Sequence, residues 1–100
     1  MSSFTLGSDV YLEFKVKVNG RNALISSVSG ELYRDDQYLF PFGARHSGNT
    51  ISCVIIGKSF TIIGDYEAKF KVGLDTMGIR EHAIPFKITE SVLGKKRAVK

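Results

Sequence analysis

The sequence has very little cysteine, and this limits how the chain can be stabilised. Cys53 is the single cysteine in 100 residues, so an intramolecular disulfide is excluded and stability must come from packing. The same scarcity favours a reducing compartment. Tryptophan is absent and proline occurs twice, whereas there are seven Phe and four Tyr. Aromatic and β-branched side chains of this kind suit a pleated, half-buried sheet.

Long hydrophobic runs are also missing. No apolar stretch approaches the roughly 20 residues that a helix needs to cross a bilayer. Residues 1–9 lack both the basic start and the apolar run of a signal peptide. We therefore expect no membrane partner, and a protein that stays in the cytoplasm where it is made or is assembled there into a larger particle.

Residues suited to catalysis or metal binding are few and far apart. Cys53 alternates with apolar residues, which indicates a buried small hydrophobe. His46 and His82 lack the close spacing of metal ligands, and the glycines lack the spacing of a phosphate-binding loop. Asp35-Asp36 has oxygen atoms that suit a hard cation, but a tight turn explains the pair better. The sequence predicts no enzyme, no cofactor and no metal site.

The clearest pattern is an alternation of apolar and charged residues over residues 63–72. One face carries Tyr66, Ala68, Phe70 and Val72, and the other carries Glu67, Lys69 and Lys71. A period of two predicts a half-buried strand. The pattern recurs with Val10, Leu12, Phe14, Val16 and Val18 in one long strand, and with Arg80, His82, Ile84, Phe86 and Ile88 in another. Pro85 interrupts the last strand and indicates an edge or a bulge there.

Turn signals separate these strands. Asn19-Gly20 predicts a tight turn before a short return strand at residues 23–25, and the serine-rich residues 26–30 lead to the next hairpin. Asp35-Asp36 predicts a hairpin between strands 31–34 and 37–40, with Pro41 ending the second strand. We expect a loop at 42–49, strands at 4–6 and 50–56, and a turn at 75–78. The spacing predicts an all-β antiparallel sandwich or barrel at residues 1–90, followed by a tail at 91–100.

The string Gly64-Asp65-Tyr66-x-Ala68-x-Phe70 resembles the corner and following strand of immunoglobulin-like domains, where a Tyr hydrogen-bonds back across the corner. Ala68 stands where antibody-type domains carry a cysteine, so the chain is similar to the cysteine-poor variety. Residues 4–89 as a whole are similar to the small immunoglobulin-like modules of tailed-bacteriophage virion proteins, such as the N-terminal domain of baseplate upper proteins and head-decoration or neck proteins. The resemblance implies an immunoglobulin-like antiparallel β-sandwich of about seven strands, with no catalytic residue.

Aromatic and arginine residues gather around the predicted hairpin. These residue types are favoured at the centres of protein interfaces. Alternate members are free to pack inward instead, but part of the group must face solvent. We predict a partner-binding surface formed by Tyr33, Arg34, Gln37, Tyr38, Phe42 and Arg45.

Positive charge is concentrated in the tail. The formal net charge is +4, and the tail supplies this excess through Lys95, Lys96, Arg97 and Lys100. We predict that these residues bind a neighbouring subunit and that the tail is flexible when free. The alternatives are a solubilising chain end and a nucleic-acid arm. The tail lacks aromatic residues that would stack on bases, so nucleic acid is the weaker alternative.

These features predict a non-enzymatic structural protein of a phage virion, in the capsid decoration, neck, tail or baseplate. We expect it to bind virion structural proteins, as a homo-oligomer or as repeated copies on a particle. The alternative functions are a small intracellular binding module or inhibitor of a host protein, and a nucleic-acid-binding β-domain.

Overall fold

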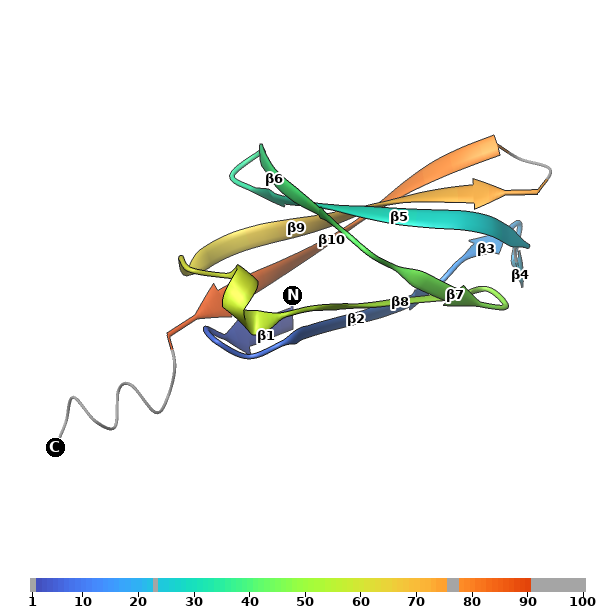
Figure 1. The fold of residues 1–100 in the computed structure, drawn as a ribbon. Helices are drawn as coiled ribbons and strands as arrows, with labels where there is room; N and C mark the ends of the chain where they lie inside the picture. Colours follow the sequence, from blue (N-terminus) through green and yellow to red (C-terminus); the bar gives the residue numbers. More distant parts are fainter. Residues whose placement is uncertain (1, 23, 76–77, 91–100) are drawn as a thin grey trace, which may run out of the picture.

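The computed structural model describes residues 2–22, 24–75 and 78–90, most of which form two β-sheets packed face to face (Figure 1). This all-β sandwich confirms the predicted fold class. The described elements are β1 (Ser2–Thr5), β2 (Val10–Lys15), β3 (Lys17–Val18), β4 (Arg21–Asn22), β5 (Ile25–Arg34), β6 (Gln37–Phe42), β7 (Arg45–Ser47), β8 (Thr50–Ile55), the short 3₁₀ helix η1 (Gly57–Ser59), β9 (Gly64–Leu74) and β10 (Gly78–Thr89).

The larger sheet has the strand order β1-β10-β9-β5-β6, and the smaller sheet has the order β2-β8-β7. Strands β3 and β4 form a separate small hairpin. The pairing of β1 with β10 is parallel, and the other described pairs are antiparallel. Strand β9 lies at the centre of the larger sheet, between β10 and β5.

The core lies between the sheets and is centred on β9. The four inward positions predicted for this strand are all at most 5% exposed: Tyr66, Ala68, Phe70 and Val72. Strands β2, β8 and β10 contribute further buried residues, namely Val10, Leu12, Ile51, Cys53, Ile55, Phe86 and Ile88. The alternation of apolar residues thus places the core correctly.

The corner before β9 contains the hydrogen bond that the resemblance implies. The Tyr66 hydroxyl donates to the carbonyl of Ile62, four residues earlier. Gly64 has a φ of 139°, which a side chain would rarely allow. This bond fixes the turn that carries the chain from the smaller sheet into β9.

The predicted opening strand is divided in two by a contact with the β7–β8 turn. The Val16 N–H donates to the Asn49 carbonyl at 2.9 Å, and the Asn49 side-chain amide donates to the Val16 carbonyl at 3.1 Å. Strand β2 therefore stops at Lys15, and β3 begins at Lys17. The tight turn is confirmed, because Asn19 and Gly20 have φ of 53° and 76°.

The return strand predicted at residues 23–25 is wrong. Strand β4 is Arg21–Asn22, directly after the turn, because a two-residue turn starts the return at once. Leu24 lies outside a strand, and Ile25 already belongs to β5.

Three further boundaries differ from prediction. The serine-rich residues 26–30 belong to β5, where Val28 pairs with Val72 and the serines lie on the exposed side. Pro41 lies inside β6, which tolerates it because β6 is an edge strand and needs no donor on its outer side. Residues 42–49 contain β7, whose three residues are all exposed and so show no alternation.

Strand β10 has an open edge along part of its length. Strand β1 pairs with Phe86 to Thr89 only, so among the described residues Pro85 has no β-strand partner on that side. This arrangement confirms the predicted edge position for Pro85. The first strand is Ser2–Thr5 rather than residues 4–6. Its end is joined to β10 because the Leu6 N–H donates to the Thr89 carbonyl at 2.8 Å.

Three predictions fall partly or wholly outside the described residues. The return strand predicted at residues 23–25 includes residue 23. The turn predicted at residues 75–78 includes residues 76 and 77, and the tail predicted at 91–100 lies entirely beyond Glu90.

Candidate functional site

The β5–β6 hairpin has the geometry that its sequence predicts. Asp35 and Asp36 adopt φ of 51° and 66°, the left-handed values that a two-residue hairpin turn requires and that Asp tolerates. We call this pair the acidic turn. It brings the end of β5 and the start of β6 to one end of the larger sheet.

A bulge in β6 determines which aromatic residues reach the surface. Leu32 pairs with Phe40, but the next residue of β5, Tyr33, pairs with Tyr38. Leu39 is therefore an extra residue in β6. Without this bulge, Tyr38 would share the core-facing side of Phe40. With it, Tyr38 lies beside Tyr33 on the outer face of the sheet, and 50% of its surface is exposed.

The two tyrosines and a lysine from β9 form one surface, which we call the tyrosine patch (Tyr33, Tyr38 and Lys69). The tyrosine rings pack edge to face with centroids 5.7 Å apart. The Lys69 Nζ lies 4.3 Å from the centre of the Tyr33 ring and 3.7 Å from a Glu67 carboxylate oxygen. A cation over a ring at an exposed site contributes about 0.5–1 kcal/mol. The contacts hold the rings in place and leave Tyr38 open to a partner.

The other residues predicted for this surface are dispersed. Gln37 is exposed at the start of β6, and Arg34 lies at the end of β5 beside a cavity. Arg45 belongs to β7 in the smaller sheet. Phe42 turns inward, with its ring centroid 5.4 Å from that of Phe70. It packs above Gly30, where a Cβ atom would lie 2.2 Å from the Phe42 ring, so Phe42 serves the core rather than the exposed surface.

A cavity of about 240 Å³, the end hollow, opens beside the acidic turn. It is lined by Arg34, Leu39, Phe40, Ser59, Thr61, Ile62 and Tyr66. A neighbouring cavity of about 150 Å³ shares Tyr66 in its wall and includes both residues of the acidic turn, with Asp65 and Glu67. Burial raises the pKa of Tyr66, so its hydroxyl keeps the proton that it donates to Ile62.

A larger cavity of about 550 Å³ lies on the smaller sheet, at the end of the β7–β8 pairing where Arg45 pairs with Ser52. Its wall includes Tyr11, Arg45, Ser52, Cys53 and Val54. The Tyr11 hydroxyl donates to Glu13 at 2.8 Å, and this hydrogen bond is the main cause of a raised pKa for Tyr11. Sequence reasoning missed this surface. The available signal was the outward position of Tyr11 and Val54 in two predicted strands.

The cysteine and the two histidines belong to three different strands, Cys53 to β8, His46 to β7 and His82 to β10. Cys53 is 5% exposed, and burial raises the pKa of its thiol to about 11, which keeps it protonated and weakly nucleophilic at neutral pH. Its prediction as a buried small hydrophobe is confirmed. His46 is exposed on β7 and His82 is half-buried in β10. Among the described residues, no group of three His, Cys, Asp or Glu side chains is placed to hold a metal ion.

The basic residues predicted to bind a partner, Lys95, Lys96, Arg97 and Lys100, lie outside the described residues. In the part of the chain that is described, no helix has the length and apolarity needed to cross a membrane. Comparisons with protein-family models, curated proteins and solved structures found no match to this chain.

Proposed function

We propose that this chain is a non-enzymatic structural protein that binds neighbouring subunits of a phage virion through the tyrosine patch. The observation that carries the proposal is the pair of Tyr38, which a β-bulge turns toward solvent, and the half-buried Tyr33, which packs against it under Lys69. Tyrosines of this kind provide contact area at little conformational cost. The virion setting comes from the resemblance of the Gly64-Asp65-Tyr66 corner and the surrounding layout to phage modules.

The proposal is tested by counting copies of the chain on purified virus particles with quantitative mass spectrometry. A fixed copy number that survives a density gradient is the expected result. Absence from particles, or recovery only in a one-to-one complex with a soluble host protein, would overturn the virion role and favour the host-binding alternative.

Two matched variants then locate the binding surface. Tyr38→Ser removes an exposed ring from the patch, and Tyr11→Ser removes an equally exposed ring (53%) from the outer face of the smaller sheet. If Tyr38 is an interface anchor, its loss weakens binding by about 1.4 kcal/mol or more, roughly tenfold. Copies per particle should fall for Tyr38→Ser and stay unchanged for Tyr11→Ser. An equal effect of the two variants would remove the patch from the proposal.

A further inference from the structure

We propose that copies of this chain bind one another head to tail. The far end of one sandwich docks on the end hollow and the acidic turn of the next copy. This inference concerns contacts between copies of the purified chain, so it does not depend on the proposed function. Its evidence is that the two ends carry opposite charges, and that apolar side chains protrude at one end and line a hollow at the other.

The two surfaces lie at opposite ends of the sandwich. The acidic turn joins β5 to β6, and the end hollow opens beside it, next to the corner that precedes β9. The β3–β4 hairpin and the starts of β5 and β10 lie at the other end (Figure 1). One copy can therefore present a different surface to each of two neighbours.

Two apolar side chains protrude at the far end. Leu24 is 73% exposed and Ile79 is 75% exposed, the highest values among the large hydrophobic side chains of the described residues. Both lie beside the end of β9, because the residue after Leu24 and the residue before Ile79 pair with Leu74. The Leu24 carbonyl accepts a hydrogen bond from the Asp75 N–H at 3.2 Å, which holds it there. We call Leu24 and Ile79 the apolar pair.

Basic side chains surround the apolar pair. Lys17 and Arg21 are exposed in the β3–β4 hairpin, and Arg80 is exposed next to Ile79. Among the described residues these three cations form no ion pair. The exposed Asp75 offsets one of them. This surface, which we call the basic end, therefore keeps positive charge for a partner.

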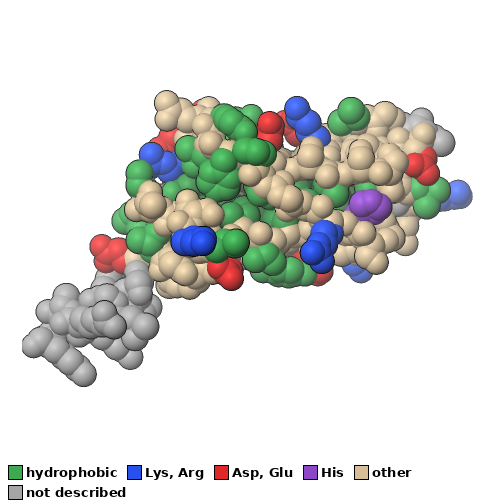
Figure 2. Space-filling model, viewed as in Figure 1, with side chains coloured by type: hydrophobic (Ala, Val, Ile, Leu, Met, Phe, Trp, Pro, Cys, Tyr) green, Lys and Arg blue, Asp and Glu red, His purple; other side chains and the backbone are tan. Residues whose placement is uncertain are grey.

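The opposite end has an apolar hollow of matching character. Ile62 and Ile63 each expose nearly half of their surface at the corner, and Ile62 is part of the wall of the end hollow. Figure 2 shows hydrophobic side chains gathered in the region where β6 and η1 lie. The hollow, about 240 Å³, is smaller than the pockets of about 300–1,000 Å³ that hold drug-sized ligands. It suits a protruding side chain better than a small molecule.

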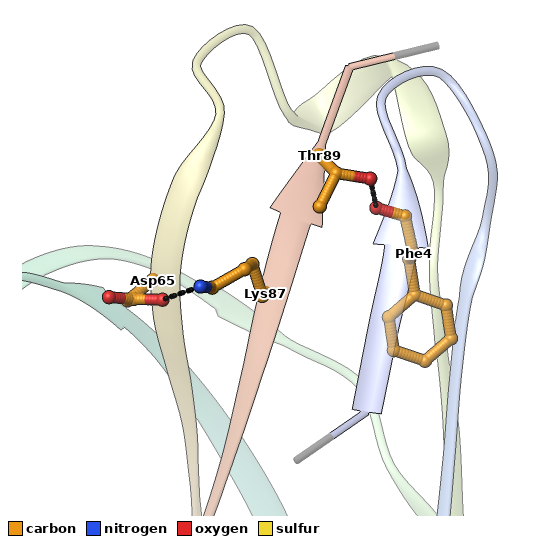
Figure 3. Close-up of polar contacts among 4 residues, drawn as sticks. All are labelled: Phe4, Asp65, Lys87 and Thr89. Carbon is orange, nitrogen blue, oxygen red and sulfur yellow. Dashed lines mark hydrogen bonds and ion pairs between the residues drawn. The ribbon is translucent and has the colours of Figure 1, made fainter. Parts of the chain in front are cut away.

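The charges beside the hollow favour a basic partner. Asp65 pairs with Lys87 at 3.8 Å (Figure 3). Glu67 pairs with Lys69. In the described part of the chain, the two carboxylates of the acidic turn form no ion pair. Arg34, in the wall of the end hollow, offsets one of them, so negative charge remains for the basic end of another copy.

These groups combine in a single contact between two copies. Leu24 enters the end hollow, Arg21 meets the acidic turn, and Ile79 packs on the isoleucines of the corner. An apolar side chain that fits a pocket elsewhere on the same molecule makes a heterologous contact, which closes into a ring or extends as a filament. Because the two surfaces differ, each copy uses both of them.

The test measures self-association of the purified chain by sedimentation equilibrium. The average mass should rise with concentration beyond that of a dimer, and added salt should weaken association because it screens the charges. Leu24→Asp blocks the basic end. Ile62→Asp blocks the acidic end and keeps the backbone carbonyl that Tyr66 binds. Each should weaken association about tenfold or more. Val54→Asp, at a similarly exposed position on the smaller sheet, is the matched control and should leave association unchanged.

Mixing the two blocked variants identifies the head-to-tail arrangement. Each alone should stay monomeric where the wild type associates. An equimolar mixture should form a dimer and stop there, because one variant keeps the acidic end and the other keeps the basic end. A wild-type chain that stays monomeric at about 1 mM would overturn the proposal. So would undiminished association of either variant, or a mixture that forms no dimer.

Discussion

Two aromatic clusters fill the core, and they differ in how their polar atom is accommodated. The corner cluster consists of Phe4, Phe60, Tyr66 and Phe86, and the middle cluster consists of Phe14, Phe42, Phe70 and His82. Each contains three phenylalanines and one side chain with polar atoms. The comparison separates the effect of packing from the effect of hydrogen bonding.

The corner cluster combines close ring contacts with a partnered hydroxyl. Phe86 is fully buried and contacts the other three rings, stacking on Tyr66 with centroids 5.7 Å apart and planes 11° apart. The Tyr66 hydroxyl reaches the carbonyl of Ile62. This end of the sandwich therefore buries a polar atom without leaving it unpaired.

The middle cluster is equally aromatic but leaves one polar atom without a partner. Phe14 packs on Phe70 at 5.0 Å and on the His82 ring at 5.3 Å. The His82 Nε2 is inaccessible to water and has no hydrogen-bond partner among the described residues. A buried unpaired polar atom costs about 1–3 kcal/mol. We infer from this difference that a buried polar side chain adds to the stability of this core only where a backbone group forms a hydrogen bond with it.

The largest expected effect is the loss of Phe86. Phe86→Ala should lower the free energy of unfolding by about 3–5 kcal/mol, the usual cost of removing a buried Phe. Phe14→Ala should cost less because Phe14 is only partly buried. Urea unfolding followed by far-UV circular dichroism measures both values, since the chain has no tryptophan. An equal or larger loss for Phe14→Ala would show that the corner cluster is not the better packed of the two.

A smaller effect is expected from the corner hydrogen bond. Tyr66→Phe keeps the ring and removes the hydroxyl, so the free energy of unfolding should fall by about 0.5–1.5 kcal/mol. Tyr38→Phe removes an exposed hydroxyl and should change it by less than about 0.5 kcal/mol. The same urea titration measures the free energy of unfolding of both variants. If both variants match the wild type, the bond from Tyr66 to Ile62 adds nothing to stability.

The fold was predictable where buried and exposed positions alternate or where a turn residue is unambiguous. Tyr66 and Phe70 lie inward as the period of two requires, and Asn19 and Asp35 adopt positive φ as their turns require. Strand β7 was not predictable, because its three residues are all exposed and carry no period. The division of the opening strand also depends on Asn49, a residue more than 30 positions from Val16.

The candidate site was predictable only in part, because residue type can be read from the sequence but a bulge and the pairing of distant strands cannot. Tyr33 and Tyr38 were identified from residue type, but strict alternation would have placed Tyr38 on the side of Phe40, and only the bulge at Leu39 turns it outward. Lys69 joins the patch through the pairing of β5 with β9, which local sequence does not specify. Bulges and non-local strand pairs therefore decided which predicted residues meet.

The last expected effect is similar in size to that of the corner hydrogen bond but has the opposite sign, and it tests the middle cluster directly. His82→Phe keeps an aromatic ring against Phe14 and removes the unpaired Nε2, so the free energy of unfolding should rise by about 1 kcal/mol. His46→Phe is the control, because His46 is exposed and its nitrogen atoms are not withheld from water. Its effect should stay within about 0.5 kcal/mol. A loss of stability in His82→Phe would mean that the histidine nitrogen finds a partner in solution, and the contrast between the two clusters would then reduce to packing alone.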